Sequence, residues 1–528
     1  MEDAHKSQST NEHPLSGRAS WALSPALALA AGLSLRLWML KQFFQVNGDT
    51  LTYGDLAKNL LRYGRYALTA SNGEIYPTLI RLPGYPLFLA LNFRLFGMEN
   101  YVAVAWVQIA LDLAGCLLLA VFAGRIAPPA LRRGAALCTL WLAALCPFTA
   151  IYAAQPLTEA PTLFVLALAL WSAARFRHRP GWPSALSFTF AVTYAALLRP
   201  DGALAALALA PALLFGLKCN EGGGAATIDS SIKDKQPQTC HPERSEAESK
   251  DLRLFLSLFG STALGRINNR KLLRMAVACL LLALTPFAVW SGRNWRVFHV
   301  FEPLAPRYAN DPGENPYPGW QLWMKTWSLD FVSTYDIYWN VPGGPLDLTK
   351  LPRRAFDSPA QYAETAALAA AYKNNGQDFT PSIDARFAQL ATERTHAHPL
   401  RTYLWLPLGR VADMALRPRV DNLPIDLDWW VYAHHNAETC FSWAYAGLNA
   451  LYLLLALAGL WLKPQFWRPM LAYLLLRCAL MATIEAPETR YTLEFFPIFF
   501  ALGGLAFYRF TYCVLPSVLK VKASAGKG

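Results

Sequence analysis

Asp49 and Arg81 are the two side chains whose types and positions in this sequence most clearly suggest chemistry. Asp49 follows the first apolar stretch within a few residues, and Arg81 lies in the same polar segment, before the second apolar stretch. A carboxylate can accept or donate a proton, and a guanidinium offers a planar fork of donors to an anion. Each also has a structural explanation, Asp49 as a helix N-cap and Arg81 as a contact to lipid headgroups.

Short, stiff elements are expected to hold both side chains at a membrane surface. Apolar residues recur at helical spacing from Tyr53 to Leu61, which predicts an amphipathic surface helix that ends at Gly64. Pro83 and Pro86 are expected to fix the start of a second short helix.

The composition indicates a membrane protein with sizeable aqueous loops. Of 528 residues, 54% are hydrophobic and only 16% are charged, whereas soluble domains carry about 25% charged residues. The mean hydropathy of +0.21 is too high for one large soluble enzyme. The net charge is +12, and the basic residues cluster beside apolar stretches. This placement is typical of topology anchors that face anionic lipid rather than of a nucleic-acid-binding surface. The nine cysteines form neither a disulfide framework nor a CxxC metal site.

The apolar stretches predict an all-α, polytopic membrane fold with about ten to twelve transmembrane helices, because a span needs about 20 mostly apolar residues. The spans are placed at Trp21–Phe43, Tyr101–Ala123, Ala135–Ala154, Pro161–Ala174, Pro183–Leu198, Ala203–Leu217, Leu272–Trp290, Phe441–Leu462, Pro469–Ile484 and Thr492–Tyr512.

Positive charge predicts which loops face the cytoplasm. Arginines and lysines gather at 125–133, 175–179, 463–468 and the C-terminus, all on the N-terminal side of the membrane. The opposite side then receives the first outer loop (45–100), the short turns before Glu159 and after Arg199, the region 291–440, and the turn before Tyr491.

The remaining segments complete the expected domain organisation. A cytoplasmic tail (1–20) precedes an N-terminal transmembrane module (21–217), and a polar insertion (218–270) is expected to be disordered and cytoplasmic. A single span (271–290) leads to the extracytoplasmic region 291–440, which is too long to lack structure. C-terminal spans (441–512) and a cytoplasmic tail (513–528) follow.

Six short motifs, in order along the chain, resemble the C-type membrane glycosyltransferases of the dolichyl-phosphate-mannose protein mannosyltransferase superfamily (glycosyltransferase family 39), and among them the bacterial enzymes similar to lipid A aminoarabinose transferase. The motifs are Gly48–Gly64, Arg81–Ala90 (ArgLeuProGlyTyrProLeuPheLeuAla), Pro156–Leu163 (ProLeuThrGluAlaProThrLeu), Leu198–Gly202, Trp290–Phe298 and Glu488–Tyr491.

The resemblance implies roles for individual residues. Asp49 matches the acidic residue that acts on the acceptor, as a base or as a hydrogen-bond acceptor. Four arginines are candidates to bind the donor phosphate, namely Arg81, Arg199, Arg293 and Arg490. Four further residues are candidates to shape the acceptor site, namely Tyr53, Tyr85, Glu159 and Tyr491.

Structural alternatives remain for these residues. The arginines could form salt bridges within the bundle, and Glu159 could be a charge favoured at a helix N-terminus. Many protein mannosyltransferases of this superfamily carry Asp-Glu where this chain has Asp49-Thr50, and this departure weakens the case for a protein acceptor. No second carboxylate can be named at nucleophile distance, so the resemblance implies inversion by direct displacement.

Cofactors are not indicated with confidence. His434 and His435 stand beside Glu438, but adjacent histidines do not easily share one metal, so a divalent metal is left as a minor alternative. The tryptophans at 295, 320, 323, 327 and 339 are expected to be interfacial anchors rather than sugar-stacking platforms.

The sequence thus favours a glycosyltransferase in the bacterial cytoplasmic membrane, with its site facing outward. Its partners would be a polyprenyl-phosphate-linked sugar, membrane lipids, and a lipid, glycan or protein acceptor. A transporter or flippase of lipid-linked sugars is the first alternative, disfavoured because no internal repeat or mid-membrane charge is evident. A non-catalytic scaffold for envelope polysaccharide assembly is the second.

Overall fold

The structure is a computed structural model that describes residues 25–215, 269–428 and 435–511. The two predicted tails and nearly all of the 218–270 insertion lie outside the described residues. Within the described part of the chain the only strands are two short ones, and helices form everything else that is regular. The predicted all-α class is therefore confirmed.

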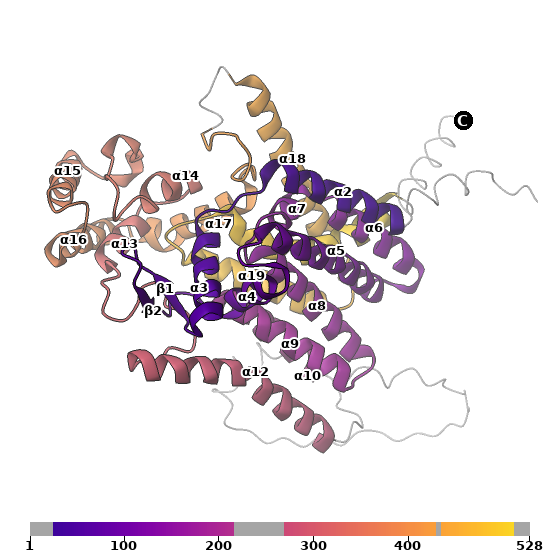
Figure 1. The fold of residues 1–528 in the computed structure, drawn as a ribbon. Helices are drawn as coiled ribbons and strands as arrows, with labels where there is room; N and C mark the ends of the chain where they lie inside the picture. Colours follow the sequence, from indigo (N-terminus) through magenta and orange to yellow (C-terminus); the bar gives the residue numbers. More distant parts are fainter. Residues whose placement is uncertain (1–24, 216–268, 429–434, 512–528) are drawn as a thin grey trace, which may run out of the picture.

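A helix occupies the position of each predicted span (Figure 1). These helices are α2 (Pro25–Phe43), α5 (Tyr101–Ile126), the pair α6 (Arg132–Ala144) and α7 (Pro147–Ala153), α8 (Glu159–His178), α9 (Trp182–Leu198), α10 (Ala203–Phe215), α12 (Asn269–Phe298), α18 (Asn436–Trp461), α19 (Trp467–Ala482) and α20 (Phe496–Arg509). Short 3-10 turns, η1 (Pro129–Leu131) and η2 (Pro200–Gly202), join neighbouring helices.

Fewer helices than predicted are long and apolar enough to cross a membrane alone. Among the described residues five satisfy length and composition, or six if the bent pair α6–α7 is one span. The others are shorter, as α9 and α10 are, or carry charge, as α2 does with Arg36 and Lys41. Length and composition alone therefore support five or six of the predicted ten to twelve spans, and the remaining predicted spans correspond to helices that are shorter or less apolar.

The first outer loop folds into helices with a hairpin between them. It comprises α3 (Asp49–Tyr63), the antiparallel strands β1 (Ala67–Thr69) and β2 (Ile75–Pro77), and α4 (Gly84–Phe96). Helix α3 ends where the sequence predicts, because Gly64 adopts a left-handed φ of 64° and its N–H bonds to the carbonyl of Leu60. The hairpin was not predicted.

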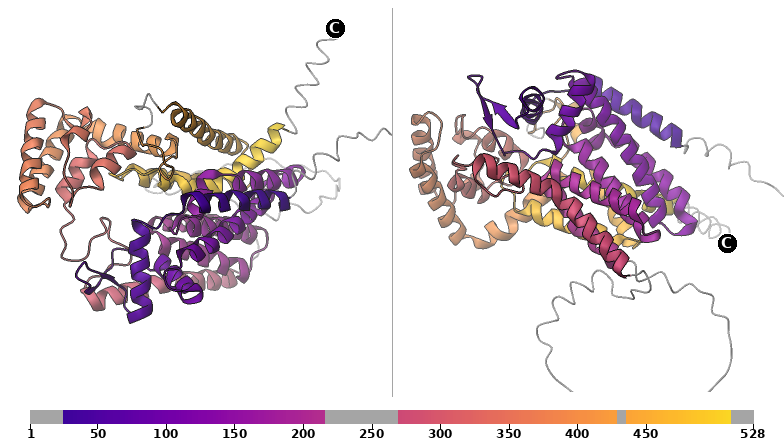
Figure 2. Two further views of the ribbon diagram at one scale, coloured as in Figure 1. Left: turned by 45° about the horizontal axis from the view of Figure 1, so that its top comes forward. Right: turned by 60° about the horizontal axis from the view of Figure 1, so that its bottom comes forward.

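The outer region forms a helical unit with its own core, beside the first outer loop at one end of the bundle (Figures 1 and 2). Its elements are α13 (Pro318–Lys325), α14 (Phe331–Ser333), η4 (Thr334–Tyr338), η5 (Leu348–Lys350), η6 (Arg353–Ala355), α15 (Pro359–Asn374), α16 (Pro381–Ala397), η7 (Arg401–Trp405) and α17 (Leu406–Leu416). A further short helix, η8 (Thr489–Phe495), leads into α20.

Three of the five tryptophans expected at the membrane interface are instead the core of this outer unit. Trp320, Trp323 and Trp327 are at most 1% exposed and pack on Phe387 and its neighbours. Their spacing of three and four residues places them on one buried face of α13 and the turn after it. Trp295 and Trp339 are about half exposed, so for these two the interfacial role stays a prediction.

One ion pair lies in the middle of the bundle, contrary to the expectation of no mid-membrane charge. Arg36 of α2 is fully buried, and its Nε donates to Oδ2 of Asp112 in α5 over 2.6 Å. Its Nη1 donates to the carbonyl of Ala144 over 2.7 Å. The pairing could not be predicted from the sequence, because each of the two charged residues stands alone in an apolar stretch.

The same arginine compensates for a broken helix. Helices α6 and α7 meet at an angle of 57°, since Pro147 has no N–H with which to continue the ladder of α6. Arg36 therefore supplies a donor to a carbonyl that the break leaves without a helical partner. This break turns the chain toward Gln155 and Glu159.

We expect Arg36→Met to lower the free energy of unfolding by about 3–5 kcal/mol, because it leaves Asp112 as an unpaired buried charge. The measurement is the thermal unfolding midpoint of the detergent-solubilised protein. Lys41→Met, on an exposed position of the same helix, is the matched control and should change the midpoint little. Equal midpoints for both variants would contradict a stabilising role for the pair.

Candidate active site

Asp49 is the first residue of α3, and its carboxylate does not cap the helix. Gly48 occupies the N-cap position with a φ of 49°, and no side chain bonds to the exposed N–H groups there. Thr50 fixes the start of the helix to the bundle, since its hydroxyl donates to the carbonyl of Pro156 over 3.1 Å. The N-cap explanation for Asp49 is therefore wrong, and its carboxylate is left to other partners.

Two arginines from distant parts of the chain hold the Asp49 carboxylate. Nη2 of Arg81 donates to Oδ1 over 3.0 Å, and Nη1 of Arg490 donates to Oδ2 over 3.0 Å. Arg81 is held in turn by the first outer loop, because the hydroxyl of Tyr66 donates to its carbonyl over 2.9 Å. The two arginines bring the first outer loop and η8 together at this one carboxylate.

Arg490 is shared among three carboxylates. Besides Asp49, its Nε donates to Oε2 of Glu488 over 2.5 Å, and its Nη1 lies 3.8 Å from Oε1 of Glu159. Glu159 is buried at the start of α8, where the helix dipole also favours its charge. Tyr491 completes this layer, as its hydroxyl donates to Oε1 of Glu488 over 2.6 Å.

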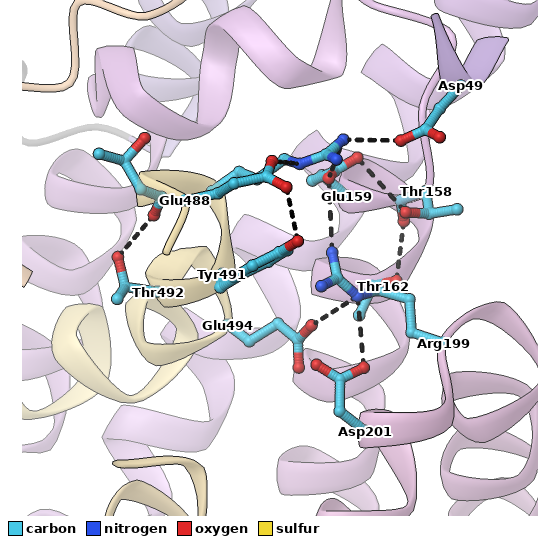
Figure 3. Close-up of polar contacts among 12 residues, drawn as sticks. Asp49, Thr158, Glu159, Thr162, Arg199, Asp201, Glu488, Tyr491, Thr492 and Glu494 are labelled. Carbon is cyan, nitrogen blue, oxygen red and sulfur yellow. Dashed lines mark hydrogen bonds and ion pairs between the residues drawn. The ribbon is translucent and has the colours of Figure 1, made fainter. Parts of the chain in front are cut away.

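A second layer of charges lies deeper in the bundle (Figure 3). Nη1 of Arg199 is 3.4 Å from Glu159, and its Nε is 3.3 Å from Asp201 and 3.4 Å from Glu494. Arg477 of α19 pairs with the same Asp201 over 3.0 Å and also with Glu494. The charges thus form one chain of ion pairs that runs from the surface of the bundle inward.

A cavity of about 1420 Å³ opens over the outer layer only. Acidic residues on its wall are Asp49, Asp336, Asp421, Asp426, Asp428 and Glu488. Basic residues on its wall are Arg81, Arg307, Lys350 and Arg490. The cavity therefore lies between the end of the bundle and the outer helical unit, and the deeper layer with Arg199 supports its floor.

The electrostatic environment keeps Asp49 ionised. Burial alone would raise the pKa of its carboxyl, but the charges and hydrogen bonds of Arg490 and Arg81 outweigh burial and lower the pKa below its usual value. Tyr53, one turn along α3, responds in the opposite direction, since burial raises the pKa of its hydroxyl to about 12. Near neutral pH the site thus holds a carboxylate and a neutral phenol.

Three of the four predicted donor-binding arginines meet in the charge network, and Arg293 does not. The guanidinium of Arg293 donates to the carbonyls of Thr78 and Tyr66 over 2.8 and 2.7 Å. It also lies over the rings of Tyr66 and Trp290. Arg293 thus braces the loop that carries Arg81 and is absent from the cavity wall, so its contacts give no support to phosphate binding.

The predicted site-shaping residues differ in how directly they reach the cavity. Tyr491 lines it and lies against Arg199, with 5.5 Å between the guanidinium carbon and the ring centre. Tyr53 lies under Arg81, 5.9 Å away by the same measure. Tyr85 is fully buried and donates to Gln108 over 2.8 Å, and Glu159 lies behind Arg490 rather than on the wall.

Among the described residues no group of three or more His, Cys, Asp or Glu side chains is arranged to hold a metal ion. The Nδ1 atom of His435 lies 3.3 Å from Oε1 of Glu438, and His434 lies outside the described residues. A divalent metal therefore stays an alternative that these residues do not support.

Several site residues were not identified from the sequence. Glu488 stands within the GluThrArgTyr motif but was passed over in favour of Arg490 and Tyr491. Arg477 and Glu494 lie in stretches that were treated as ordinary spans. Asp421 belongs to the loop ArgProArgValAspAsn, in which two arginines and one aspartate stand at every second position. This concentration of charge is a signal that could have identified it.

Comparison with known proteins gives remote structural likenesses only. No protein-family model and no curated protein matches the chain. The archaeal oligosaccharyltransferase AglB from Archaeoglobus fulgidus, in complex with an inhibitory peptide and a dolichol-phosphate, is 13% identical; the match covers 96% of this chain and 52% of that one, with a TM-score of 0.44. ArnT from Cupriavidus metallidurans, bound to undecaprenyl phosphate, is 14% identical, with coverages of 93% and 77% and a TM-score of 0.35. The chain thus spans about half the length of the oligosaccharyltransferase.

The charge network predicts an order of stability for two variants. Arg490→Met should lower the thermal unfolding midpoint more than Arg81→Met. Arg490 forms ion pairs with the buried Glu159 and Glu488 as well as with Asp49, whereas among the described residues Arg81 forms an ion pair only with Asp49. Removing one partner of a buried pair costs about 3–5 kcal/mol, whereas a pair that is partly exposed to solvent, such as Arg81 and Asp49, contributes less. The reverse order would show that Arg490 is not the central cation.

Proposed function

We propose that this chain is a membrane glycosyltransferase of the C-type fold, which moves a sugar from a polyprenyl-phosphate donor to an acceptor hydroxyl. The observation that carries this proposal is the Asp49 carboxylate held between Arg81 and Arg490 on the wall of one cavity. A carboxylate turned to lipid, with no basic group nearby, would have argued against it.

The two arginines provide what a lipid-phosphate leaving group requires. When the bond between the sugar and the phosphate breaks, negative charge develops on a phosphate oxygen, and fixed guanidinium groups stabilise that charge. Arg81 and Arg490 are fixed, since each is ion-paired and belongs to a different element. Both lie at the end of the bundle, where the phosphate of a membrane-embedded lipid would be found.

The size and polarity of the cavity suit two substrates. Pockets for single small molecules span about 300–1,000 Å³, and this cavity of about 1420 Å³ exceeds that range. Charged and aromatic side chains line it together, among them Tyr335, Trp339 and Tyr491. Such a wall can hold a sugar by hydrogen bonds and by stacking, and leaves room for an acceptor beside the donor.

The distribution of positive charge supports a cavity on the extracytoplasmic side. Arg125 of α5 and Arg175 of α8 flank the ring of Trp171, at 5.3 and 5.4 Å. These residues end helices whose opposite ends, at Tyr101 and Glu159, reach the site end of the bundle. By the positive-inside rule the arginine-rich end faces the cytoplasm, so we place the protein in a bacterial inner membrane with the cavity facing outward.

The transport alternative is less well supported. The mid-bundle pair of Arg36 and Asp112 is buried and contributes nothing to the cavity wall, whereas a carrier needs its polar site to open to both sides of the membrane.

The proposed acceptor is a hydroxyl of a lipid, a glycan or a protein. Mass spectrometry of envelope lipids and glycoproteins from cells with and without the gene would identify it.

The proposal predicts that Asp49→Asn and Arg81→Ala insert into the membrane but lose sugar transfer by about a hundredfold or more, because each removes a charge that the reaction needs. The measurement is the amount of glycosylated product in membranes of cells that express each variant. Glu74→Gln, which alters an exposed carboxylate of the same outer loop, is the matched control and should retain full transfer.

Undiminished transfer by Asp49→Asn, at wild-type protein levels, would refute the role of this carboxylate. Flux of a lipid-linked sugar across vesicles, without any glycosylated product, would favour the transporter instead.

A further inference from the structure

We infer that Asp421, and not Asp49, accepts the proton of the acceptor hydroxyl, while Asp49 holds the two arginines in place for the donor phosphate. This inference rests on the proposed function and divides its acid–base chemistry between two carboxylates of the same cavity.

Asp49 is poorly placed to accept a proton because both of its oxygens are occupied. Oδ1 accepts a hydrogen bond from Arg81 and Oδ2 accepts one from Arg490, each over 3.0 Å. To bind a proton, the carboxylate would have to give up charge that balances these two cations. The lowered pKa of Asp49 has the same cause, and a weakly basic carboxylate is a weak general base.

One carboxylate oxygen of Asp421 receives no hydrogen bond within the described part of the chain. Its Oδ2 accepts a hydrogen bond from the hydroxyl of Thr489, whereas its Oδ1 is buried and receives no hydrogen bond from any described residue. A buried acceptor without a donor is unusual in folded proteins and costly. An acceptor hydroxyl in the cavity is a group that could satisfy it.

The position of Asp421 places this oxygen beside the donor site. Its partner Thr489 is the residue before Arg490, whose guanidinium holds Asp49. Both Asp421 and Thr489 line the cavity, together with Asp49 and Arg490. A hydroxyl at Asp421 and a phosphate at Arg490 would thus lie in one space.

The loop that carries Asp421 is braced from several sides. The guanidinium of Arg419 donates to Asn449 of α18 over 3.2 Å and to the carbonyl of Thr489 over 2.9 Å. It also lies 5.0 Å from the ring centre of Phe496. A catalytic group must be held within a fraction of an ångström of its working position, and these contacts tie the loop to η8 and α18.

The pKa values of Asp49 and Asp421 are shifted in opposite directions. Burial raises the pKa of Asp421, against the hydrogen bond from Thr489 and the charges of Arg419 and Arg417. Tyr152 of α7 and Tyr445 of α18 are the other titratable groups that interact with it. Two carboxyls whose pKa values are pushed apart within one site commonly divide its roles, and the more basic one is the better proton acceptor.

The proposed step balances as follows. The acceptor O–H proton passes to Oδ1 of Asp421, and the acceptor oxygen forms a bond to the anomeric carbon of the sugar. The bond between that carbon and the phosphate oxygen breaks, and its electron pair leaves with the polyprenyl phosphate, which Arg81 and Arg490 stabilise. The protein supplies a base but no nucleophile of its own, so the acceptor displaces the phosphate in a single step and the anomeric configuration inverts.

Asp428 provides the matched control. It lines the same cavity, and its Oδ1 is likewise buried without a partner among the described residues. Burial and the negative charge of Asp336 raise its pKa. Among the described residues, however, only Asp421 of these two is hydrogen-bonded to η8. The inference therefore assigns the proton to Asp421 and predicts that Asp428→Asn keeps the loss of transfer at low pH.

The test measures transfer by the full-length protein in membranes from pH 4 to pH 8, with the polyprenyl-phosphate sugar and acceptor found by envelope mass spectrometry. For the wild type, kcat/KM should fall as the pH drops through a carboxyl pKa above the ordinary value of about 4, because the base becomes protonated. Asp421→Asn, whose amide oxygen can still accept from Thr489, should lower kcat by about 10²- to 10⁴-fold and remove this limb. Formate should partly restore transfer to Asp421→Ala, which a purely structural role would not allow.

Three outcomes would overturn the inference alone, namely near-normal transfer by Asp421→Asn, loss of the acid limb in Asp428→Asn instead, or a product with retained anomeric configuration. Absence of any transfer by the wild-type protein would overturn the proposed function and this inference with it.

Discussion

Charges inside a helical bundle must be paired, and this requirement organises the whole functional end of the molecule. The free energy needed to move an isolated charge out of water exceeds the net stability of a folded protein, whereas charges of alternating sign that pair with one another can be buried. Arg81, Asp49, Arg490, Glu159 and Arg199 form such a chain, each within 3.8 Å of the next. No member can be removed without leaving its neighbours unbalanced.

This pairing also explains how distant parts of the chain become one site. Arg81 comes from the first outer loop, Arg490 from η8, and Glu159 from the start of α8. Each helix end delivers one or two charges, and the network links the ends to one another. The cavity lies over the outermost layer only, so the deeper charges hold the floor in position while Asp49, Arg81 and Arg490 remain within reach of a ligand.

The sequence allowed part of this arrangement to be predicted, and physical reasons account for the rest. Asp49, Arg81 and Arg199 were identifiable because a charge beside an apolar stretch stands out, and α3 was identifiable from its helical spacing and Gly64. A single charge within an apolar stretch gives no sign of its partner. For this reason the sequence did not reveal Arg477, Glu494 or the pair of Arg36 and Asp112.

Other residues were assigned a wrong role. Arg293 was expected to bind phosphate, because its carbonyl partners at Thr78 and Tyr66 have no signature in the sequence. The tryptophans of α13 were placed at the wrong surface, since the same residues suit a membrane interface and a soluble core.

The central claim is that Arg81 and Arg490 hold the phosphate of a polyprenyl carrier in the cavity over Asp49. An electron cryo-microscopy structure of the protein in nanodiscs with undecaprenyl phosphate tests it most directly. The account predicts phosphate density within about 3 Å of at least one of these two guanidinium groups, the length of a charge-assisted hydrogen bond. Phosphate bound instead at the arginine-rich opposite end, beside Arg125 and Arg175, would contradict it.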